Sequence, residues 1–135
     1  MNRSDARELF MQLLFQMEVQ NDYGKIIKER FFAGKPDPEK QKTYLEKMCA
    51  LITESLHETD DLIESCSEKW KIERICKVDL AVMRTAIFEI KHMDDIPDSV
   101  AVNEAVEIAK KYGTANSGKF VNGILGKVVK IKNEG

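Results

Sequence analysis

The sequence predicts an all-α protein, and three observations lead to that fold class. Apolar residues recur every three or four positions along almost the whole chain, and no stretch alternates apolar and polar residues over the length of a strand. Pro36, Pro38 and Pro97 divide the periodic segments. The chain has 135 residues, of which 43% are hydrophobic, which is enough for one domain with a hydrophobic core. We therefore expect a single domain over residues 1–135, built from helices in two small packed bundles.

The first half of the chain contains two short helices followed by a long one. The first is predicted from about Ser4, a residue type that caps helix N-termini, to about Val19. The second covers about Tyr23 to Phe32, and the segment GKPDP at 34–38 ends it. A long helix follows from Glu39. The residues TDD at 59–61 resemble a helix start, which predicts a bend or a further helix from that point.

The second half contains three more predicted helices. The segment VDLAVMRTAIFEI at 78–90 is apolar nearly all round, which is typical of a central helix surrounded by others. A helix from about Val100 to Tyr112 is expected to end at Gly113, because glycine suits the left-handed C-terminal cap. A last helix begins at Ser117. The expected total is seven helices.

Composition and charge exclude several classes of protein. The net charge of −2 argues against a protein that coats nucleic acid indiscriminately. Residues 36–98 are acidic and residues 99–135 are basic, so two chemically different partners are possible. No apolar run approaches the 18 residues of a membrane span, and the N-terminus does not resemble a secretory signal, so a cytoplasmic protein without membrane contact is expected. The three cysteines form no CxxC pair and predict neither a disulfide framework nor a zinc site.

Motifs for catalysis are weak. The stretch GTANSGKF at 113–120 matches the phosphate-binding P-loop in all but its last letter. A working P-loop needs a strand before the glycine and Ser or Thr after the lysine, but the preceding segment is helical and Phe120 follows Lys119. His57 and His92 each lack a second metal-ligand residue at helical spacing. We expect no catalytic residues, no metal site and no cofactor.

The first helix carries a second row of residues beside its apolar stripe. Arg3, Arg7, Met11 and Phe15 recur every four residues and therefore lie one per turn. One interpretation is that Phe15 packs against another helix or a dimer partner. The other is that two guanidinium groups lead to an exposed ring, a combination that holds single-stranded nucleic acid.

The start of the last helix offers a second aromatic and basic pair. Lys119 and Phe120 are adjacent, and Ser117 opens the helix where free N–H groups attract anions. This arrangement supports a shared site for nucleic acid with the first helix. Phe120 as an ordinary core residue is the alternative.

Four segments together resemble one known family. ARELFMQLLFQ at 6–16, VDLAVMRTAIFEI at 78–90, DIPDSVAVNEAVEIAKKYG at 95–113 and KFVNGILGK at 119–127 are similar to the NusB transcription antitermination factors, in the same order along the chain. The resemblance implies seven helices in two packed three-helix subdomains, about 1–75 and 76–135, and no enzymatic activity. It also implies that the chain suppresses premature termination by RNA polymerase, as an antitermination factor in the cytoplasm.

The resemblance also implies partners. They are a single-stranded boxA RNA from ribosomal RNA operon leaders, the ribosomal protein NusE, other Nus factors and RNA polymerase. Arginines and Lys119 would neutralise phosphates, aromatic rings would stack on bases, and Asp79 would accept hydrogen bonds from base N–H groups. The family's RNA-binding surface carried over to this chain comprises Arg3, Arg7, Phe15, Asp79, Tyr112, Asn116, Ser117, Lys119 and Phe120.

Two departures and one rival hypothesis stand beside this interpretation. Many family members begin with a run of arginines, whereas this chain has Arg3 and Arg7, and position 116 is Asn where related sequences can carry an acid. The rival is a helical module that dimerises or docks in an RNA-modification or ribosome-assembly complex. A homodimer would cover the row from Arg7 to Phe15.

Overall fold

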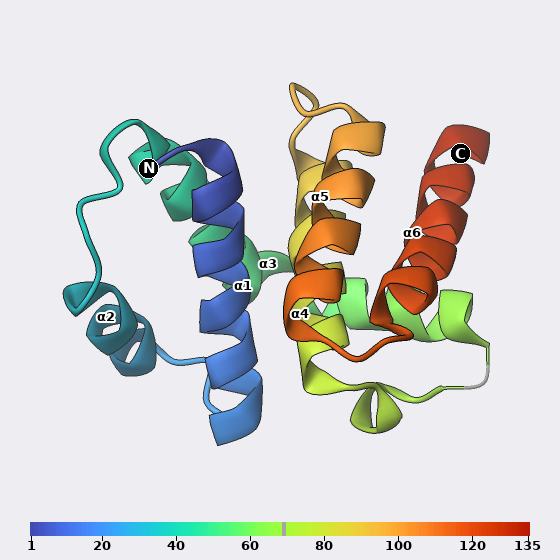
Figure 1. Ribbon diagram of the computed structural model, residues 1–135, viewed down its shortest axis with the longest axis horizontal. Coiled ribbons are helices and arrows are strands. Elements are labelled where there is room, and N and C mark those ends of the chain that lie inside the picture. Colours follow the sequence, from blue (N-terminus) through green and yellow to red (C-terminus); the bar gives the residue numbers. More distant parts are fainter. Residues whose placement is uncertain (69) are drawn as a thin grey trace.

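The computed structural model describes residues 1–68 and 70–135, and over these residues the chain is all-α, as predicted. The described residues contain six α-helices and two short 3-10 helices, so the expectation of seven helices is wrong (Figure 1). The helices are α1 (Arg3–Gln20), α2 (Lys25–Ala33), η1 (Glu39–Gln41), α3 (Lys42–Ser67), η2 (Ile72–Arg74), α4 (Lys77–His92), α5 (Asp98–Tyr112) and α6 (Ser117–Glu134).

The helix count differs because α3 continues where a new start was expected. Its 26 residues run without interruption through the TDD segment. Thr59 is buried, and the Asp60 carboxylate receives two hydrogen bonds from Arg84 of α4, at 2.8 and 2.7 Å. An acidic residue that pairs with a neighbouring helix has no need of a free helix N-terminus. The TDD segment, which resembles a helix start, therefore marks an interhelical contact.

The ends of the helices have their own local causes. Asn2 caps α1: its side chain accepts a hydrogen bond from the Asp5 amide at 2.8 Å, and the Asp5 carboxylate accepts one from the Asn2 amide at 3.1 Å. This reciprocal pair satisfies two free N–H groups and places the cap two residues before Ser4. Gly113 ends α5 with φ −94° and ψ −161°, which is extended and not the left-handed conformation that was expected.

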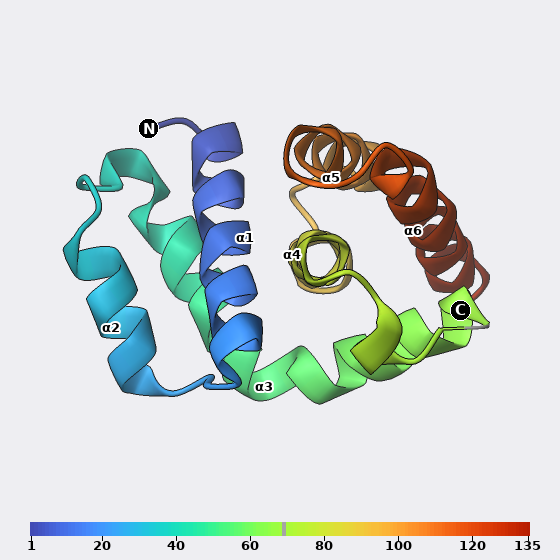
Figure 2. The same ribbon diagram turned by 60° about the horizontal axis from the view of Figure 1, so that its bottom comes forward.

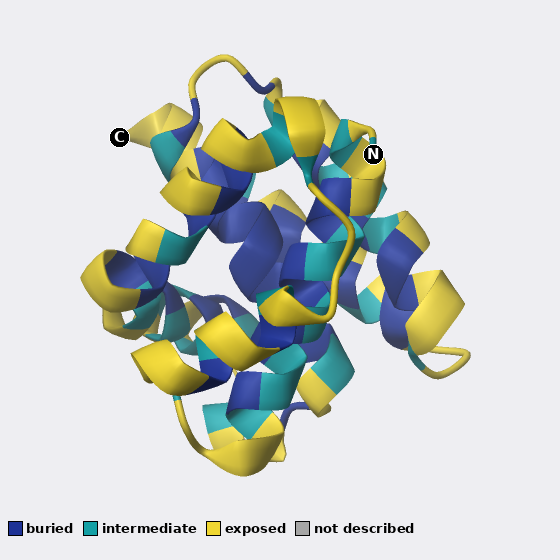
Figure 3. Ribbon diagram, turned by 90° about the vertical axis from the view of Figure 1, so that its left-hand side faces the viewer, coloured by how far each residue is buried: buried dark blue, intermediate teal, exposed yellow. Residues whose placement is uncertain are grey.

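Helix α4 forms the centre of the molecule, as its apolar sequence predicted. Every residue from 81 to 90 is buried, and α4 packs against α1, α3, α5 and α6. Figure 2 shows α4 nearly end-on between α1 on one side and α5 with α6 on the other. In Figure 3 the buried residues line the inner faces of the helices, and the exposed residues lie on the outer faces and in the loops. The core is thus continuous around one helix.

Helix α3 runs across the molecule beneath the others (Figure 2). Its packing partners are α1 on one side and α4 and α6 on the other, with α2 next to α1 (Figure 1). The division into subdomains at about residue 75 stays a prediction. No helix of the described chain is long and apolar enough to cross a membrane.

Candidate nucleic-acid interface

Arg7 lies inside the molecule. It is 5% exposed, and its Nε is 2.9 Å from both carboxylate oxygens of Glu89 on α4. Its Nη1 donates a hydrogen bond to Glu104 of α5 at 2.9 Å. Glu89 is fully buried and also accepts a hydrogen bond from the Tyr44 hydroxyl at 2.5 Å. The Arg7 guanidinium group, which was predicted to neutralise phosphate, therefore binds two carboxylates of the protein itself.

Glu89 has an unusual environment for a carboxylate. Burial raises its pKa, while the Tyr44 hydroxyl and Arg7 act in the opposite direction. The buried location also raises the pKa of Tyr44 well above its ordinary value, with the neighbouring Glu89 charge adding to the effect. This cluster joins α1, α3, α4 and α5 and has a structural role.

Arg3 is more accessible than Arg7 but is also engaged. Its Nε donates a hydrogen bond to the Gln41 side chain at 2.7 Å, and its guanidinium carbon lies 4.3 Å from the centre of the Tyr44 ring. The side chain is half-buried. Helix geometry separates Arg3 from Phe15 by about 18 Å along α1. Arg3 therefore lies at the far end of the helix from the aromatic end of the predicted row.

The middle of that row faces inward. Met11 is 2% exposed, and Phe15 is partly buried against the hydrophobic core. Packing against other helices and exposure to a ligand were the two alternatives predicted for Phe15. It shows both in part, because it packs on the core and is still partly exposed. The row from Arg3 to Phe15 is not an exposed stripe.

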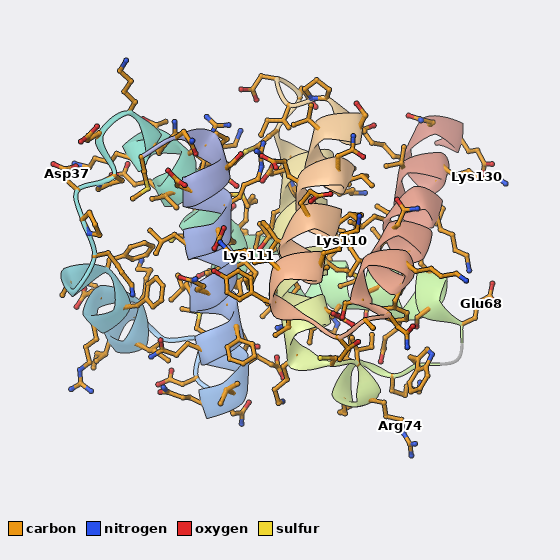
Figure 4. All side chains as sticks on the ribbon, in the orientation of Figure 1. Asp37, Glu68, Arg74, Lys110, Lys111 and Lys130 are labelled. Atoms are coloured by element: carbon orange, nitrogen blue, oxygen red, sulfur yellow. The ribbon has the colours of Figure 1, made fainter. Side chains whose placement is uncertain are left out.

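Tyr112 at the end of α5 connects that helix to α1. Its hydroxyl contacts the Glu8 carboxylate and accepts a hydrogen bond from Gln12 at 3.1 Å. Lys111 forms an ion pair with Glu8 at 2.8 Å, and its Nζ lies 5.3 Å from the centre of the Tyr112 ring. Figure 4 shows Lys110 and Lys111 on α5, on the side that faces the viewer. The hydrogen bond to Glu8 raises the pKa of Tyr112.

The junction between α5 and α6 is a tight turn. Ser117 is 1% exposed, and its Oγ accepts a hydrogen bond from the Thr114 amide at 2.9 Å. Asn116, not Ser117, occupies the N-cap position; it is exposed and its side chain makes no capping hydrogen bond. A Cβ on Gly113 would lie 2.3 Å from Ser117 Oγ and 2.7 Å from the Ala109 carbonyl oxygen. Glycine is therefore required here by close approach rather than by backbone conformation.

Asp79 lies in the first turn of α4, next to this junction. It is 6% exposed, and its Oδ1 has no hydrogen-bond partner among the residues that the structure describes. Burial raises its pKa, and the neighbouring Ser117 hydroxyl lowers it in part. A buried acceptor without a partner is uncommon in folded proteins and suggests a place for a ligand donor.

Phe120 and Lys119 open onto a groove of about 450 Å³ between α6 and the end of α3. Phe120 is half-buried and Lys119 is exposed. The groove is lined by Cys66, Ser67, Trp70, Asn116, Lys119, Phe120, Gly123, Ile124 and Lys127. Sequence reasoning missed Trp70 and Lys127 as candidates. A signal for Trp70 was present, because the only tryptophan of the chain stands between two lysines in KWK at 69–71.

Most of the predicted site residues form one connected region, and Arg3 and Arg7 lie outside it. Asp79 adjoins Ser117, Asn116, Lys119 and Phe120 share the groove, and Tyr112 joins this region to α1 through Glu8 and Gln12. Arg3 lies apart, and Arg7 is buried. No group of three or more His, Cys, Asp or Glu side chains that could hold a metal ion occurs in the described part of the chain.

The fold and this region define an all-α protein with aromatic, basic and hydrogen-bonding groups at a helix junction. The chain belongs to the NusB family, whose family model matches residues 4–130, and this family consists of transcription antitermination factors rather than enzymes. The chain is 44% identical to the transcription antitermination protein NusB of Acetivibrio thermocellus over 132 residues, which cover 98% of this chain and 91% of that protein. It is 45% identical to the NusB protein of Alkaliphilus oremlandii over 130 residues, covering 96% and 94%.

Solved structures show the same fold. A structure of T. maritima NusB has a TM-score of 0.85 and 39% sequence identity, and the match covers 96% of this chain and 92% of that one. A structure of the antitermination factors NusB and NusE in complex with double-stranded RNA matches with a TM-score of 0.82 at 21% identity, covering 96% of each chain.

Proposed function

We propose that this chain binds a single-stranded boxA RNA of ribosomal RNA operon leaders and does so together with the ribosomal protein NusE. With other Nus factors and RNA polymerase, this complex would suppress premature termination in the cytoplasm. Membership of the antitermination family supports the proposal. The solved complex of a NusB and a NusE factor with double-stranded RNA supports NusE and an RNA as partners.

The observation that carries the RNA assignment is the junction between α5 and α6. An exposed lysine, a half-buried phenylalanine and an uncapped helix N-terminus lie together at the start of α6. Ser117 in the same turn adjoins Asp79, whose buried Oδ1 has no hydrogen-bond partner among the residues that the structure describes. RNA offers a complement to each of these groups. Phosphates suit Lys119 and the free amides of α6, a base suits the Phe120 ring, and base N–H groups suit Asp79.

The roles of the remaining residues follow from their positions. Tyr112 and Phe15 extend the aromatic surface toward α1, and Asn116 supplies a neutral donor and acceptor at the turn. Arg3 provides a cation at the distant end of α1. Arg7 acts through other residues: it holds Glu89 and Glu104 and thereby positions α1 against α4 and α5.

The finer features of the architecture and assembly belong to the same proposal. The two subdomains, about 1–75 and 76–135, would meet along α1 and α4, and the RNA region would extend from this boundary over the junction to α6. The acidic segment at 36–98 would face basic NusE. The homodimer considered from the sequence stays a prediction.

A binding titration tests the proposal. Labelled boxA RNA is titrated with the protein, with and without NusE, at several salt concentrations, and fluorescence anisotropy reports the affinity. Phe15→Ala and Phe120→Ala should each weaken RNA binding by about 1 to 3 kcal/mol, the value of one lost base stack. Unchanged affinity in both variants, with folding intact by circular dichroism, would contradict the RNA surface, and a salt slope near zero would contradict phosphate contacts.

A further inference from the structure

We propose that the groove containing Trp70 is a second base-binding subsite, so that a single-stranded RNA continues past Phe120 across α6 to the end of α3. This inference rests on the proposed function and names residues outside the predicted site: Trp70, Ser67 and Lys127. The occupant is one or more nucleotides of the same RNA strand.

The size and composition of the groove fit a nucleotide. Its volume of about 450 Å³ lies within the range of ligand sites, roughly 300 to 1,000 Å³. Trp70 is 48% exposed, so about half of its surface is open to a ligand. Trp70 and Phe120 line the same groove. Two rings in one groove offer stacking surfaces for bases regardless of sequence.

The charges of the groove favour a nucleic-acid backbone. Lys119 and Lys127 both line it, about two turns apart on α6. Lys127 donates a hydrogen bond to the Cys66 carbonyl at 3.1 Å and lies 3.4 Å from the Glu68 carboxylate. Glu68 is the acidic group nearest to this lysine, and its side chain points outward from the end of α3 (Figure 4). The Lys127–Glu68 contact is at the surface and weak, so a phosphate can replace it.

Continuity with the RNA region identifies the occupant. Asn116, Lys119 and Phe120 belong both to the groove and to the junction, so a strand that stacks on Phe120 already enters it. Ser67 adds a polar group, and its hydroxyl donates a hydrogen bond to the Trp70 carbonyl oxygen at 2.7 Å, with the Glu64 carbonyl oxygen as the competing acceptor at 3.1 Å. That bonding holds the backbone of Trp70 in place and fixes one wall of the groove.

The single tryptophan makes the inference directly testable. Because the chain has one Trp, its fluorescence reports on this groove alone. Unlabelled boxA RNA with a few extra nucleotides at either end is added to the full-length protein. Where RNA binding requires NusE, a NusE protein without tryptophan is included. Base stacking should quench the emission, with a midpoint at the RNA concentration that half-saturates the anisotropy of the labelled RNA.

Two substitutions and a matched control complete the test. Trp70→Ala should weaken RNA binding roughly five- to 150-fold, whereas Trp70→Phe should restore most of the affinity. Lys127→Ala should reduce the slope of log affinity against log salt by about 0.7. The control is Lys130→Ala, which removes the same charge from α6 at a residue outside the groove (Figure 4) and should leave the affinity nearly unchanged.

The outcomes separate this inference from the proposed function. RNA binding by anisotropy without a change in Trp70 emission, and with wild-type affinity in Trp70→Ala, would overturn the subsite and leave the RNA surface at Phe120 intact. Absence of RNA binding under all conditions would overturn both. An emission change that depends on protein concentration or on NusE alone, and not on RNA, would assign the groove to a protein partner and also overturn the subsite.

Discussion

Replacing Arg7 by Met tests whether this residue holds the fold together or contacts RNA. The substitution keeps an unbranched side chain but leaves the Glu89 carboxylate, which is 0% exposed, without its cation. Breaking a buried ion pair by removing one partner costs about 3 to 5 kcal/mol. The total stability of a domain is about 5 to 15 kcal/mol. We therefore expect Arg7→Met to remove a large part of the free energy of unfolding.

Urea unfolding followed by circular dichroism measures this loss, and its pH dependence identifies the cause. Burial already raises the pKa of Glu89 in the wild-type protein, and loss of Arg7 raises it further. A carboxyl with a raised folded-state pKa costs stability above that pKa, and the cost disappears as the pH falls through it. The difference between Arg7→Met and wild type should therefore shrink as the pH falls from neutral through the raised pKa of Glu89.

The double variant Arg7→Met/Glu89→Gln provides the control. It removes the buried charge while the amide can still accept the hydrogen bond from Tyr44, so it should be more stable than Arg7→Met alone. A loss below about 1 kcal/mol in Arg7→Met, or a loss that stays constant as the pH falls from neutral, would refute the reasoning. In the double variant the salt slope of RNA binding should match wild type; a slope reduced by about 0.7 would show that Arg7 contacts phosphate after all.

Two further predictions concern the α5–α6 junction and its neighbour on α4. Gly113→Ala should lower the free energy of unfolding by about 1 to 3 kcal/mol, because its Cβ would lie 2.3 Å from Ser117 Oγ; a Tm equal to wild type in a thermal melt would contradict this. Asp79→Asn should raise stability at pH 7 by up to about 1 kcal/mol while weakening RNA binding, because it neutralises a buried carboxylate whose pKa is raised by burial. The stability gain should fade as the pH drops through that pKa, since wild-type Asp79 is then neutral too, and a gain that is constant with pH would point to another cause.

The fold class and the central helix could be predicted because they depend on apolar periodicity alone. The continuity of α3 could not be predicted, because Asp60 resembles a helix cap in the sequence and its contact with Arg84 is known only from the structure. The position of Arg7 has the same origin: spacing puts it one turn from Arg3, but only the neighbouring helices turn it inward to Glu89. Trp70 was visible in the sequence, yet its groove exists only where the end of α3 approaches α6. Local patterns predict elements, and interhelical contacts decide which side chains remain free.

Four charged side chains between α1 and α4, of which only Glu18 is partly exposed, also determine which way round these two helices pair. At one end of the contact the cation belongs to α1 and the anion to α4, as Arg7 and Glu89. At the other end the signs are exchanged, with Glu18 on α1 and Arg84 on α4, 2.8 Å apart. If α4 were reversed against α1, arginine would meet arginine and glutamate would meet glutamate, at a cost of several kcal/mol in a buried setting. A core that is apolar all round would accept either orientation of α4 against α1. These four side chains permit only the observed one.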